Sequence, residues 1–560
     1  MKRLIAILIA ALPMLAMAQN AAVNVRVDSV GQLASKIGED KFYKISELTV
    51  SGPLNGADLK LLQQIVTRTK TNQKNPGECL VTAIDLTDIT IEASKGGKGA
   101  MKTQANELPS GFFSSAKALL KAKLPISVAA VSKNCFNNCT SLAEVTIPES
   151  VTVIEDGAFE DCSQLAVVNL PQGLRSLGKN VFEGCKALKS VSIPVGINKL
   201  ESDAFKGCEQ LTEVNLPDKL VLIGNSAFKG CMQLKGINLP KSVSELGSSA
   251  FEDCVNLETI NLTNVNKVGN YAFEDCKNLT IASFEQLSKL GISAFRNCQS
   301  LSSINIKEGL GDISSAAFQG CINLNSITMP AAVKTIGSNA FEGCKSLAEI
   351  NLPQALLKIE SHAFENCSSL KYAIIPNMVK SIGTSVFENC TNLDSVVING
   401  YIAEISNDLF RKCHSLRVIS IPASVKKVGS KSFQDCNALT DIQLPIALTS
   451  IGDNAFERCT SLTTVKLPVA VSTIGSSAFA ECAMLSSIEL PAALKKIGGS
   501  AFSKCTQLRE VTLNTPAPPS ISNSTFKGVN AVYIIPKGSL SAYIAHKDWQ
   551  KISGYREKLK

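Results

Sequence analysis

The chain has 560 residues, of which 45% are hydrophobic and 19% are charged, and its formal net charge is +8. A positive charge this mild, spread over this length, argues against a nucleic-acid-binding protein, which usually carries a concentrated basic domain. The unusual part of the composition is its 19 cysteines, set against a single tryptophan.

Residues 1–18 have the pattern of a secretory signal peptide. Lys2 and Arg3 give a positive start, residues 4–15 form an apolar stretch, and a small-residue cleavage site follows, so the mature chain is expected to begin at Gln19. No other segment approaches the about 20 apolar residues that a membrane span needs. The sequence therefore predicts an exported protein without a membrane span, either on the cell surface, secreted or in the periplasm.

Residues 19–108 are predicted to form an N-terminal capping domain. Residues 45–50 and 81–86 alternate apolar and polar side chains as strands do, and residues 57–67 carry apolar side chains at helical spacing. The glycine- and lysine-rich segment 95–102 lacks the glycine that a phosphate-binding P-loop has before its lysine, so a flexible solvated loop is expected there.

From Cys139 to Cys505, seventeen cysteines recur every 23 residues, with two intervals of 22 residues. Each has a phenylalanine three residues before it and a leucine three residues after it. A globular core cannot hold such columns, because each of its positions meets different neighbours, whereas a solenoid stacks each unit on a copy of itself. The repeat predicts one solenoid over residues 109–514, closed by a cap at each end.

Each turn is predicted to contain two short extended pieces. Val145 and Ile147 alternate with polar residues and indicate a strand that pairs in parallel with its copy in the next turn. Pro148 ends this strand, and proline recurs in this column in twelve of the seventeen turns. Val151 and Ile154 indicate the second piece, and the Ala-Phe-x-x-Cys segment then predicts a turn or short 3₁₀ segment with the phenylalanines stacked as an interior spine.

A glycine often follows the second piece, where we expect the chain to turn tightly. These glycines include Gly178, Gly224, Gly337, Gly383 and Gly452. The fold predicted is a β-rich, α/β-type repeat solenoid of about 17–18 turns of 23 residues, with N- and C-terminal caps.

These columns resemble the BspA-like leucine-rich repeats of bacterial surface proteins. The segment from Leu142 to Ile147 has the form L-x-x-V-x-I, close to the leucine-rich-repeat core, and Phe159, Cys162 and Leu165 continue the unit. The resemblance covers roughly residues 109–514. It implies an exported protein without catalytic activity that acts as an adhesin for host extracellular matrix or for other cells.

The cysteine column is expected to consist of small buried apolar side chains. Stacked thiols that point the same way lack the opposed geometry of a disulfide, and each would have to choose between identical neighbours. Cys135 stands where other turns carry alanine, and Cys79 alone lies off the repeat.

The two shorter turns coincide with loss of the strand-ending proline, at Thr263, Glu285 and Lys307. Residues 263–312 are therefore expected to be locally irregular, either as a tolerated deletion or as a bend that shapes a binding surface.

Residues 515–560 are predicted to form the C-terminal cap. Residues 532–535 read as a last strand, and residues 539–552, which include Trp549, read as a helix that closes the stack.

The sequence shows no cluster of catalytic or metal-binding residues, and no catalytic residue, metal or cofactor is predicted. The three histidines lie far apart in the sequence, and no serine has a nucleophile-elbow context. Acid pairs such as Glu160-Asp161, Glu252-Asp253 and Glu274-Asp275 recur just before the cysteine and are expected on a solvated edge.

Two rows of polar residues are candidate binding surfaces. The candidate ligand-facing strand row is Asn169, Asn215, Asn238, Asn261, Asn305 and Asn351. The candidate basic edge row is Lys334, Lys358, Lys380, Lys426, Lys427, Lys495 and Lys496, continued by Lys199, Lys267, Lys289 and Arg175 and interrupted by Glu245, Asp312 and Glu404.

Each row has two interpretations. The asparagine row either binds a protein or glycan or simply keeps the strands solvated. In the basic row, like charges on adjoining strands repel, so an anionic partner such as a sulfated glycan or acidic protein would relieve a cost; otherwise the lysines blunt an exposed edge.

The function predicted is adhesion to, or recognition of, a host or cell-surface protein or glycan. Anionic ligands and components of the extracellular matrix are among the expected partners, and nucleic acid is not expected as a partner. The alternatives are a periplasmic or envelope scaffold and a glycan-binding accessory protein.

Overall fold

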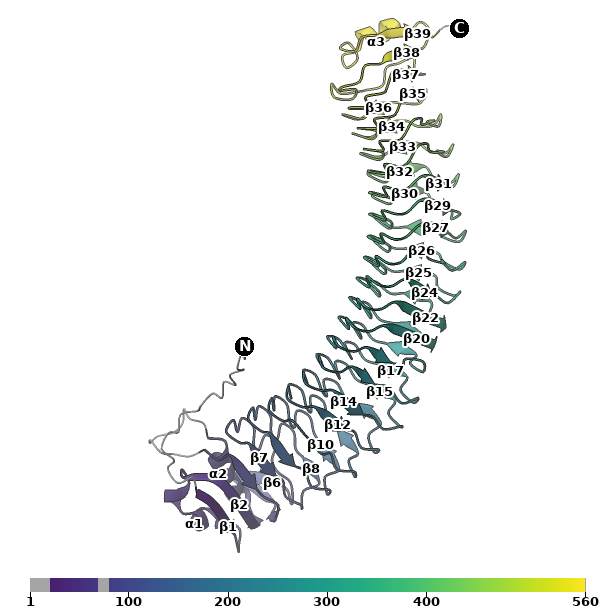
Figure 1. Cartoon of the computed structure of the whole chain (residues 1–560). Coiled ribbons are helices and arrows are strands. Elements are labelled where there is room, and N and C mark those ends of the chain that lie inside the picture. Colours follow the sequence, from purple (N-terminus) through teal and green to yellow (C-terminus); the bar gives the residue numbers. More distant parts are fainter. Residues whose placement is uncertain (1–20, 69–79, 559–560) are drawn as a thin grey trace, which may run out of the picture. The chain divides into compact units, whose positions relative to one another are not determined.

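The computed structural model of the protein describes residues 21–68 and 80–558 (Figure 1). The chain divides into two compact units, Met1–Pro217 and Asp218–Lys560. The predicted signal peptide, residues 1–18, and Cys79 lie outside the described residues. The boundaries proposed for the two caps, at residues 108 and 514, stay predictions.

The first unit begins with a parallel sheet whose last strand, β9, already belongs to the repeats. Its strands follow the order β1-β2-β3-β7-β9, and β4 pairs with β2. Their bounds are β1 Ala21–Arg26, β2 Ile45–Leu54, β3 Ala83–Asp85, β4 Ile89–Ile91, β7 Lys121–Lys123 and β9 Glu144–Thr146. The strands expected over residues 45–50 and 81–86 are confirmed.

Helices α1 (Leu33–Ile37) and α2 (Gly56–Val66) belong to the same unit, with a short 3₁₀ helix at Glu39–Lys41. The α2 helix confirms the expectation for residues 57–67. Its start is fixed because the Asn55 side chain accepts hydrogen bonds from the first turn while the Asp58 carboxylate accepts one from the Asn55 N–H at 3.1 Å.

The expectation of a flexible loop over residues 95–102 is wrong. This segment forms an antiparallel hairpin of β5 (Ser94–Gly97) and β6 (Ala100–Thr103), and β6 packs against α2. The Thr103 hydroxyl donates to the Glu92 carbonyl at 2.7 Å, which holds the end of the hairpin.

The repeats of the first unit carry two parallel ladders, as the alternation of apolar residues predicts. The first ladder continues with β12 (Ser190–Ser192) and β14 (Glu213–Asn215). The second comprises two-residue strands, β8 Ala130–Val131, β10 Val153–Ile154, β11 Ser176–Leu177 and β13 Lys199–Leu200.

The second unit repeats the same two ladders, all parallel. Its first ladder comprises β16 Gly236–Ile237, β18 Thr259–Ile260, β20 Ile281–Gln286, β22 Ser303–Glu308, β24 Ser326–Thr328, β27 Tyr372–Ile375, β29 Ser395–Ile398, β31 Val418–Ser420, β35 Ser487–Leu490, β37 Glu510–Leu513, β38 Val532–Ile535 and β39 Tyr555–Glu557.

Its second ladder comprises β15 Leu222–Ile223, β17 Glu245–Leu246, β19 Lys267–Val268, β21 Lys289–Leu290, β23 Asp312–Ile313, β25 Thr335–Ile336, β26 Lys358–Ile359, β28 Ser381–Ile382, β30 Glu404–Ile405, β32 Lys427–Val428, β33 Ser450–Ile451, β34 Thr473–Ile474 and β36 Lys496–Ile497. Figure 1 shows each turn of this unit as one coil of a stack. The predicted repeat solenoid is confirmed.

The phenylalanines form the expected interior spine in both units. In the first unit, neighbouring rings from Phe113 to Phe205 lie 4.9 to 5.5 Å apart. In the second unit, successive rings from Phe228 to Phe526 stack at 5.0 to 5.8 Å with their planes within 23° of parallel. This spacing follows from the strand separation of about 4.8 Å, because one ring enters the core per turn.

The cysteines lie beside this spine, and all 18 in the described residues are buried thiols that form no disulfide. Thiols of the repeat column donate to a phenylalanine carbonyl one turn back: Cys139 donates to the Phe113 carbonyl at 3.0 Å, and Cys505 to the Phe479 carbonyl at 3.1 Å. The column therefore does more than fill space, because the thiol adds a second hydrogen bond to a backbone carbonyl that already accepts one within its own turn, as Phe479 does from the Cys482 N–H at 3.3 Å.

Glycine recurs at these positions for a different reason from the tight turn that we expected, and that expectation is wrong. Gly178 and Gly337 do not have the positive φ of a tight-turn glycine. Instead, a Cβ at Gly178 would lie 2.5 Å from the backbone N of Asp156, and one at Gly337 would lie 2.6 Å from that of Ser315. Glycine is required because the preceding turn of the stack approaches too closely for a side chain.

Loss of the strand-ending proline is accompanied by longer strands at two of its three sites, Glu285 and Lys307, whereas β18 before Thr263 keeps two residues. β20 and β22 have six residues each, and their register runs from Ile281↔Ser303 to Gln286↔Glu308. The change follows because a residue other than proline has an N–H: Glu285, in the proline column, donates to the Thr263 carbonyl at 3.4 Å. The irregular curvature expected over residues 263–312 stays a prediction.

The chain after residue 514 ends in strands β38 and β39, with helix α3 (Leu540–Ala545) between them. The strand expected at 532–535 is confirmed, but the helix expected over 539–552 covers only α3. Trp549 lies beyond the helix, fully buried, with its indole N–H donating to the Pro519 carbonyl at 2.7 Å.

Candidate binding surfaces

The asparagine row lies on the outward side of the first ladder, as expected. Asn169, Asn215, Asn238, Asn261 and Asn351 are exposed, and Asn305 is half-buried. Only Asn215, in β14, and Asn305, in β22, lie inside strands. The Asn215 amide donates to the Ser192 hydroxyl at 3.2 Å, and Asn261 accepts from the Thr263 N–H at 3.1 Å, so part of the row already bonds within the stack.

The outward column changes character beyond Asn351. Ile374 and Val397 take the position that asparagine holds earlier, and their side chains are 54% and 37% exposed. In the β27-β29-β31 sheet, Ile374 pairs with Val397, and Val418, 60% exposed, lies in register with Ser395 and Tyr372. We call Tyr372, Ile374, Val397 and Val418 the apolar sheet patch.

The apolar sheet patch is continued at the turns that follow these strands. Met378 and Tyr401 occupy the same column in adjacent turns and are 52% and 79% exposed. Sequence reasoning missed this surface because it followed asparagine along the column and stopped at Asn351. The signal was present, since isoleucine and valine at consecutive outward positions break the apolar-in, polar-out alternation.

The corresponding face of the first unit is charged and internally neutralised. A surface hollow of about 200 Å³ there is lined by residues of β2, β3, β7 and β9. Lys123 pairs with Asp85 at 2.9 Å and Lys121 with Glu144 at 3.1 Å. These four charges are matched within the unit, so the net charge of the hollow comes only from Glu47, which also lines it.

The basic edge row falls into paired and unpaired lysines. Lys267 contacts Glu245 at 2.5 Å, and Lys427 contacts Glu404 at 3.6 Å. In both pairs the glutamate lies in the preceding strand of the second ladder. Lys199 and Lys358 contact the glutamate two residues further on, at 2.6 and 2.8 Å. The lysines without an ion-pair partner in the described parts of the chain are Lys289, Lys334, Lys380, Lys426, Lys495 and Lys496.

Four of the unpaired lysines lie in one column of the second unit. The Leu357 N–H donates to the Lys334 carbonyl and the Lys380 N–H to that of Leu357, at 2.8 and 2.9 Å. The same ladder connects Lys426 to Lys495 through two intervening turns. All four are exposed, so this column is a line of unneutralised positive charge.

The acid pairs before the cysteines do not all lie on a solvated edge, and that expectation is wrong for Glu274. Its side chain is only 6% exposed, and burial raises its pKa while the adjoining Arg296, with which it forms an ion pair, opposes the shift. Similar pairs join Glu183 to Lys206 at 2.9 Å and Glu252 to Lys229 at 2.7 Å. These charges cross-link successive turns.

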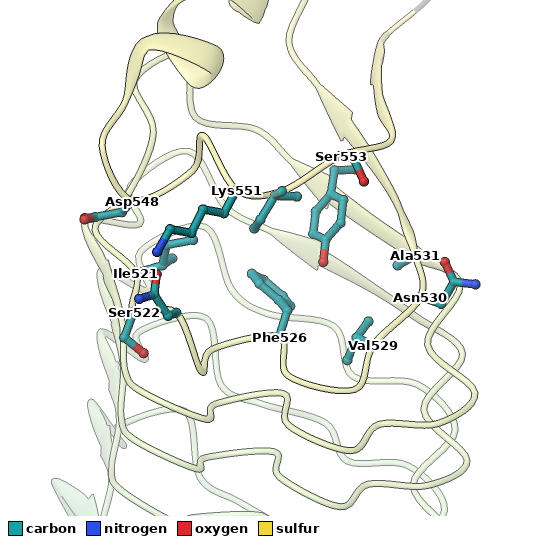
Figure 2. A pocket seen from close by; sticks show the side chains of 12 residues that line it. Ile521, Ser522, Phe526, Val529, Asn530, Ala531, Asp548, Lys551 and Ser553 are labelled. Carbon is teal, nitrogen blue, oxygen red and sulfur yellow. The ribbon is translucent and has the colours of Figure 1, made fainter.

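A pocket of about 260 Å³ lies in the C-terminal part of the second unit (Figure 2). Phe526, the last ring of the spine, lies at its centre, with Asp548 and Lys551 on one side and Val529 and Asn530 on the other. No sequence pattern pointed to it, because its lining comes from several segments that only the fold of the chain end brings together.

Across residues 21–68 and 80–558, no group of three or more histidine, cysteine, aspartate or glutamate side chains is placed to hold a metal ion. Each histidine has a local contact instead. The His362 ring bonds the Glu365 carboxylate at 2.6 Å, and His414 bonds the Asp435 carbonyl at 3.0 Å. None of the helices in this part of the chain is long and apolar enough to cross a membrane.

Stacked turns with two parallel ladders, a cysteine column and a phenylalanine spine define a leucine-rich-repeat solenoid. A family model described as "BspA type Leucine rich repeat region (6 copies)" matches residues 106–231, 198–325, 311–440 and 426–543. These matches together extend over residues 106–543, well over half of the chain. The chain belongs to this family, and the resemblance seen in its sequence is confirmed.

Solved structures of bacterial leucine-rich-repeat proteins are similar to this chain. A leucine-rich repeat protein from Bacteroides ovatus is 25% identical over 73% of this chain and 88% of its own, with a TM-score of 0.49. A leucine rich cell surface protein from Faecalibacterium prausnitzii is 22% identical over 64% of this chain and 89% of its own, with a TM-score of 0.34. A comparison with curated proteins finds no similar sequence.

Proposed function

We propose that this leucine-rich-repeat protein is exported and recognises a protein ligand outside the cell, without chemistry of its own. The observation that carries the proposal is the apolar sheet patch on β27, β29 and β31. The signal-peptide pattern of residues 1–18 supports export.

Single exposed apolar side chains are ordinary on protein surfaces, but contiguous ones are not. Tyr372, Ile374, Val397 and Val418 are contiguous because they face outward from three adjacent parallel strands about 4.8 Å apart. A core of aromatic and aliphatic side chains with a charged rim is the usual composition of a protein-binding surface. Here Arg417 and Asp394, paired at 2.5 Å, supply part of that rim.

The test compares two surface variants of the full chain against immobilised, purified extracellular-matrix proteins. In the first, Ile374→Asp and Val397→Asp place charges in the patch, and binding is expected to weaken at least about tenfold, because each charge must lose its water on contact. In the second, Ile281→Asp is the matched control, since Ile281 has 56% exposure in β20 but pairs with Ser303.

The control variant is expected to bind as the unaltered chain does. Equal binding by both variants and the unaltered chain would place the contact elsewhere and refute the patch. Failure of every matrix protein to bind, with the protein confirmed outside the cell by its accessibility, would refute matrix recognition itself.

The lysine column supports a second candidate function, binding of an anionic glycan. Lys334, Lys380, Lys426 and Lys495 stand on one edge without ion-pair partners in the described residues, so an extended polyanion could contact them all. Heparin is the probe. Its affinity is expected to fall steeply as salt is raised from about 0.05 to 0.2 M, because screening weakens exposed charges.

The charge variant changes Lys334, Lys380 and Lys426 to glutamine. Its matched control changes three exposed lysines off the column, Lys235, Lys345 and Lys371. Loss of heparin binding in the first variant alone supports this candidate, whereas equal loss in both indicates only the net charge of the protein.

A further inference from the structure

The C-terminal pocket contains a polar group that makes no hydrogen bond within the described part of the chain. Tyr533, in β38, lines the pocket and is only 5% exposed. In the described part of the chain its hydroxyl has no hydrogen-bond partner. The neighbouring tyrosines differ, because Tyr543 donates to the Thr515 carbonyl at 2.8 Å and Tyr555 to the Trp549 carbonyl at 2.9 Å.

A hydroxyl that makes no bond within the protein is free to bond a molecule that enters the pocket. Burial raises the pKa of Tyr533, so the phenol stays neutral and can both donate and accept. Its ring is held firmly, edge-on to Phe526 at 5.3 Å and to Trp549 at 6.2 Å. The hydroxyl is thus a fixed polar group at the wall of a pocket that solvent can enter.

The other lining groups share one chemistry. Asn523, Asn530, Ser522 and Ser553 are amides and hydroxyls that donate and accept, as the Tyr533 hydroxyl does. Figure 2 shows Ser522 and Asn530 on opposite sides of Phe526, so that polar groups flank an apolar floor. The one carboxylate and the one amine, Asp548 and Lys551, lie on the same side and leave the pocket without net charge.

We propose that this pocket binds a single neutral sugar ring, either free or at the end of a glycan chain. Sugar hydroxyls donate and accept in the same way as the lining groups, and the C–H groups of the ring can contact the half-buried side chains of Ile521, Val529 and Ile552. The volume of about 260 Å³ is below the about 300–1,000 Å³ of pockets for drug-sized ligands, which suits one ring better than several.

This site is separate from the apolar sheet patch and does not depend on it. The Ile374→Asp and Val397→Asp variant is therefore expected to bind sugar as the unaltered protein does, so failure of one proposal leaves the other standing.

The experiment uses the full-length protein and a panel of methyl glycosides, followed by saturation-transfer NMR and then calorimetry. Oligosaccharides that end in the same sugars form a second arm, and free amino acids form a third. The variant is Tyr533→Phe, which removes only the unpartnered hydroxyl, so folding is expected to be unchanged. Tyr401→Phe, at a 79% exposed tyrosine outside the pocket, is the matched control.

The expected result is saturable binding of at least one glycoside, weakened about tenfold by Tyr533→Phe and unchanged by Tyr401→Phe. Binding of oligosaccharides alone, with the same dependence on Tyr533, would identify a chain end as the source of the sugar. A second pair of variants is expected to behave in the same way. Lys551→Ala, at the rim of the pocket, should weaken sugar binding, whereas Lys547→Ala, outside the pocket, should leave it unchanged.

Three results would overturn the proposal. One is no saturable binding in either sugar arm, and another is sugar binding that Tyr533→Phe leaves unchanged. The third is binding of amino acids in place of sugars, which would assign Asp548 and Lys551 to a zwitterion and make the chemical class wrong.

Discussion

Backbone conformation at single residues explains two further columns of the repeat. The residue directly before each cysteine of the stack has a positive φ, as in Asn138 at 60° and Gly343 at 72°. The residue four positions earlier does too, as in Asn134 at 55° and Asn339 at 59°. Glycine, asparagine and aspartate predominate in the first of these columns because they tolerate the left-handed region best, whereas serine is the commonest residue in the second. The sequence carries this signal, but it was not used.

The glycine after the second ladder gives a direct test of close approach between turns. We expect Gly178→Ala to lower the free energy of unfolding by about 2 kcal/mol or more, because the new Cβ would meet the backbone of Asp156 at 2.5 Å and the turns must separate. Gly173→Ala is the control in the adjoining segment, since its nearest atom would lie at 3.8 Å. Chemical denaturation followed by circular dichroism measures both, and equal stability of the two variants would contradict the packing described.

At the scale of elements, strand length follows the proline column. In the repeats, strands of the first ladder have at most four residues where proline follows them and reach six in β20 and β22, where it is absent, although β18 before Thr263 keeps two. The sequence predicted the ladders, the spine and helix α2 because each depends on local alternation or on a column that repeats. It misjudged the hairpin β5–β6 and the extent of α3, since both depend on packing with distant segments.

The phenylalanine spine is the element on which the stack depends most. Phe341 is fully buried and stacks at 5.3 Å on both Phe318 and Phe364. We expect Phe341→Ala to cost about 3–5 kcal/mol, because the cavity lies between two turns that cannot collapse independently. Ile446→Ala, at a side chain that is 77% exposed, should change stability by less than about 0.5 kcal/mol.

Denaturation of the two variants side by side checks this prediction. If Phe341→Ala lowers the free energy of unfolding no more than Ile446→Ala does, the spine fills space without holding the turns together.

At the scale of the whole molecule, the buried thiols are expected to lower the stability of the fold at alkaline pH. Burial raises the pKa of Cys139 and of Cys321 from 9.0 to about 12. In the unfolded chain these thiols ionise near their ordinary value, so between about pH 9 and 12 the unfolded state binds fewer protons than the folded state. Stability should be fully present below pH 9 and fall steeply above it.

Denaturation midpoints between pH 8 and 10.5 test this, although lysines and tyrosines titrate in the same range. The control therefore replaces Cys321, Cys344 and Cys367 with alanine, which should make the loss of stability with pH shallower. An unchanged pH dependence in that variant would show that the thiols do not contribute.

The candidate surfaces could be predicted from the sequence only where a column repeats. The lysine column was visible because its members recur at fixed spacing, but which of them are neutralised depends on glutamates in other turns. The apolar sheet patch was visible as a break in a column and was overlooked. The pocket around Tyr533 could not be predicted, because segments 521–533 and 548–553 meet only in the folded chain end.

The central claim is that the protein acts outside the cell through its repeat surface, and protease shaving of intact cells tests it most directly. A known periplasmic protein serves as the control for an intact envelope. We predict that the repeats are cut while the control survives. If the repeats are cut only after the outer membrane is breached, the protein is not at the surface and recognition of a ligand outside the cell is wrong.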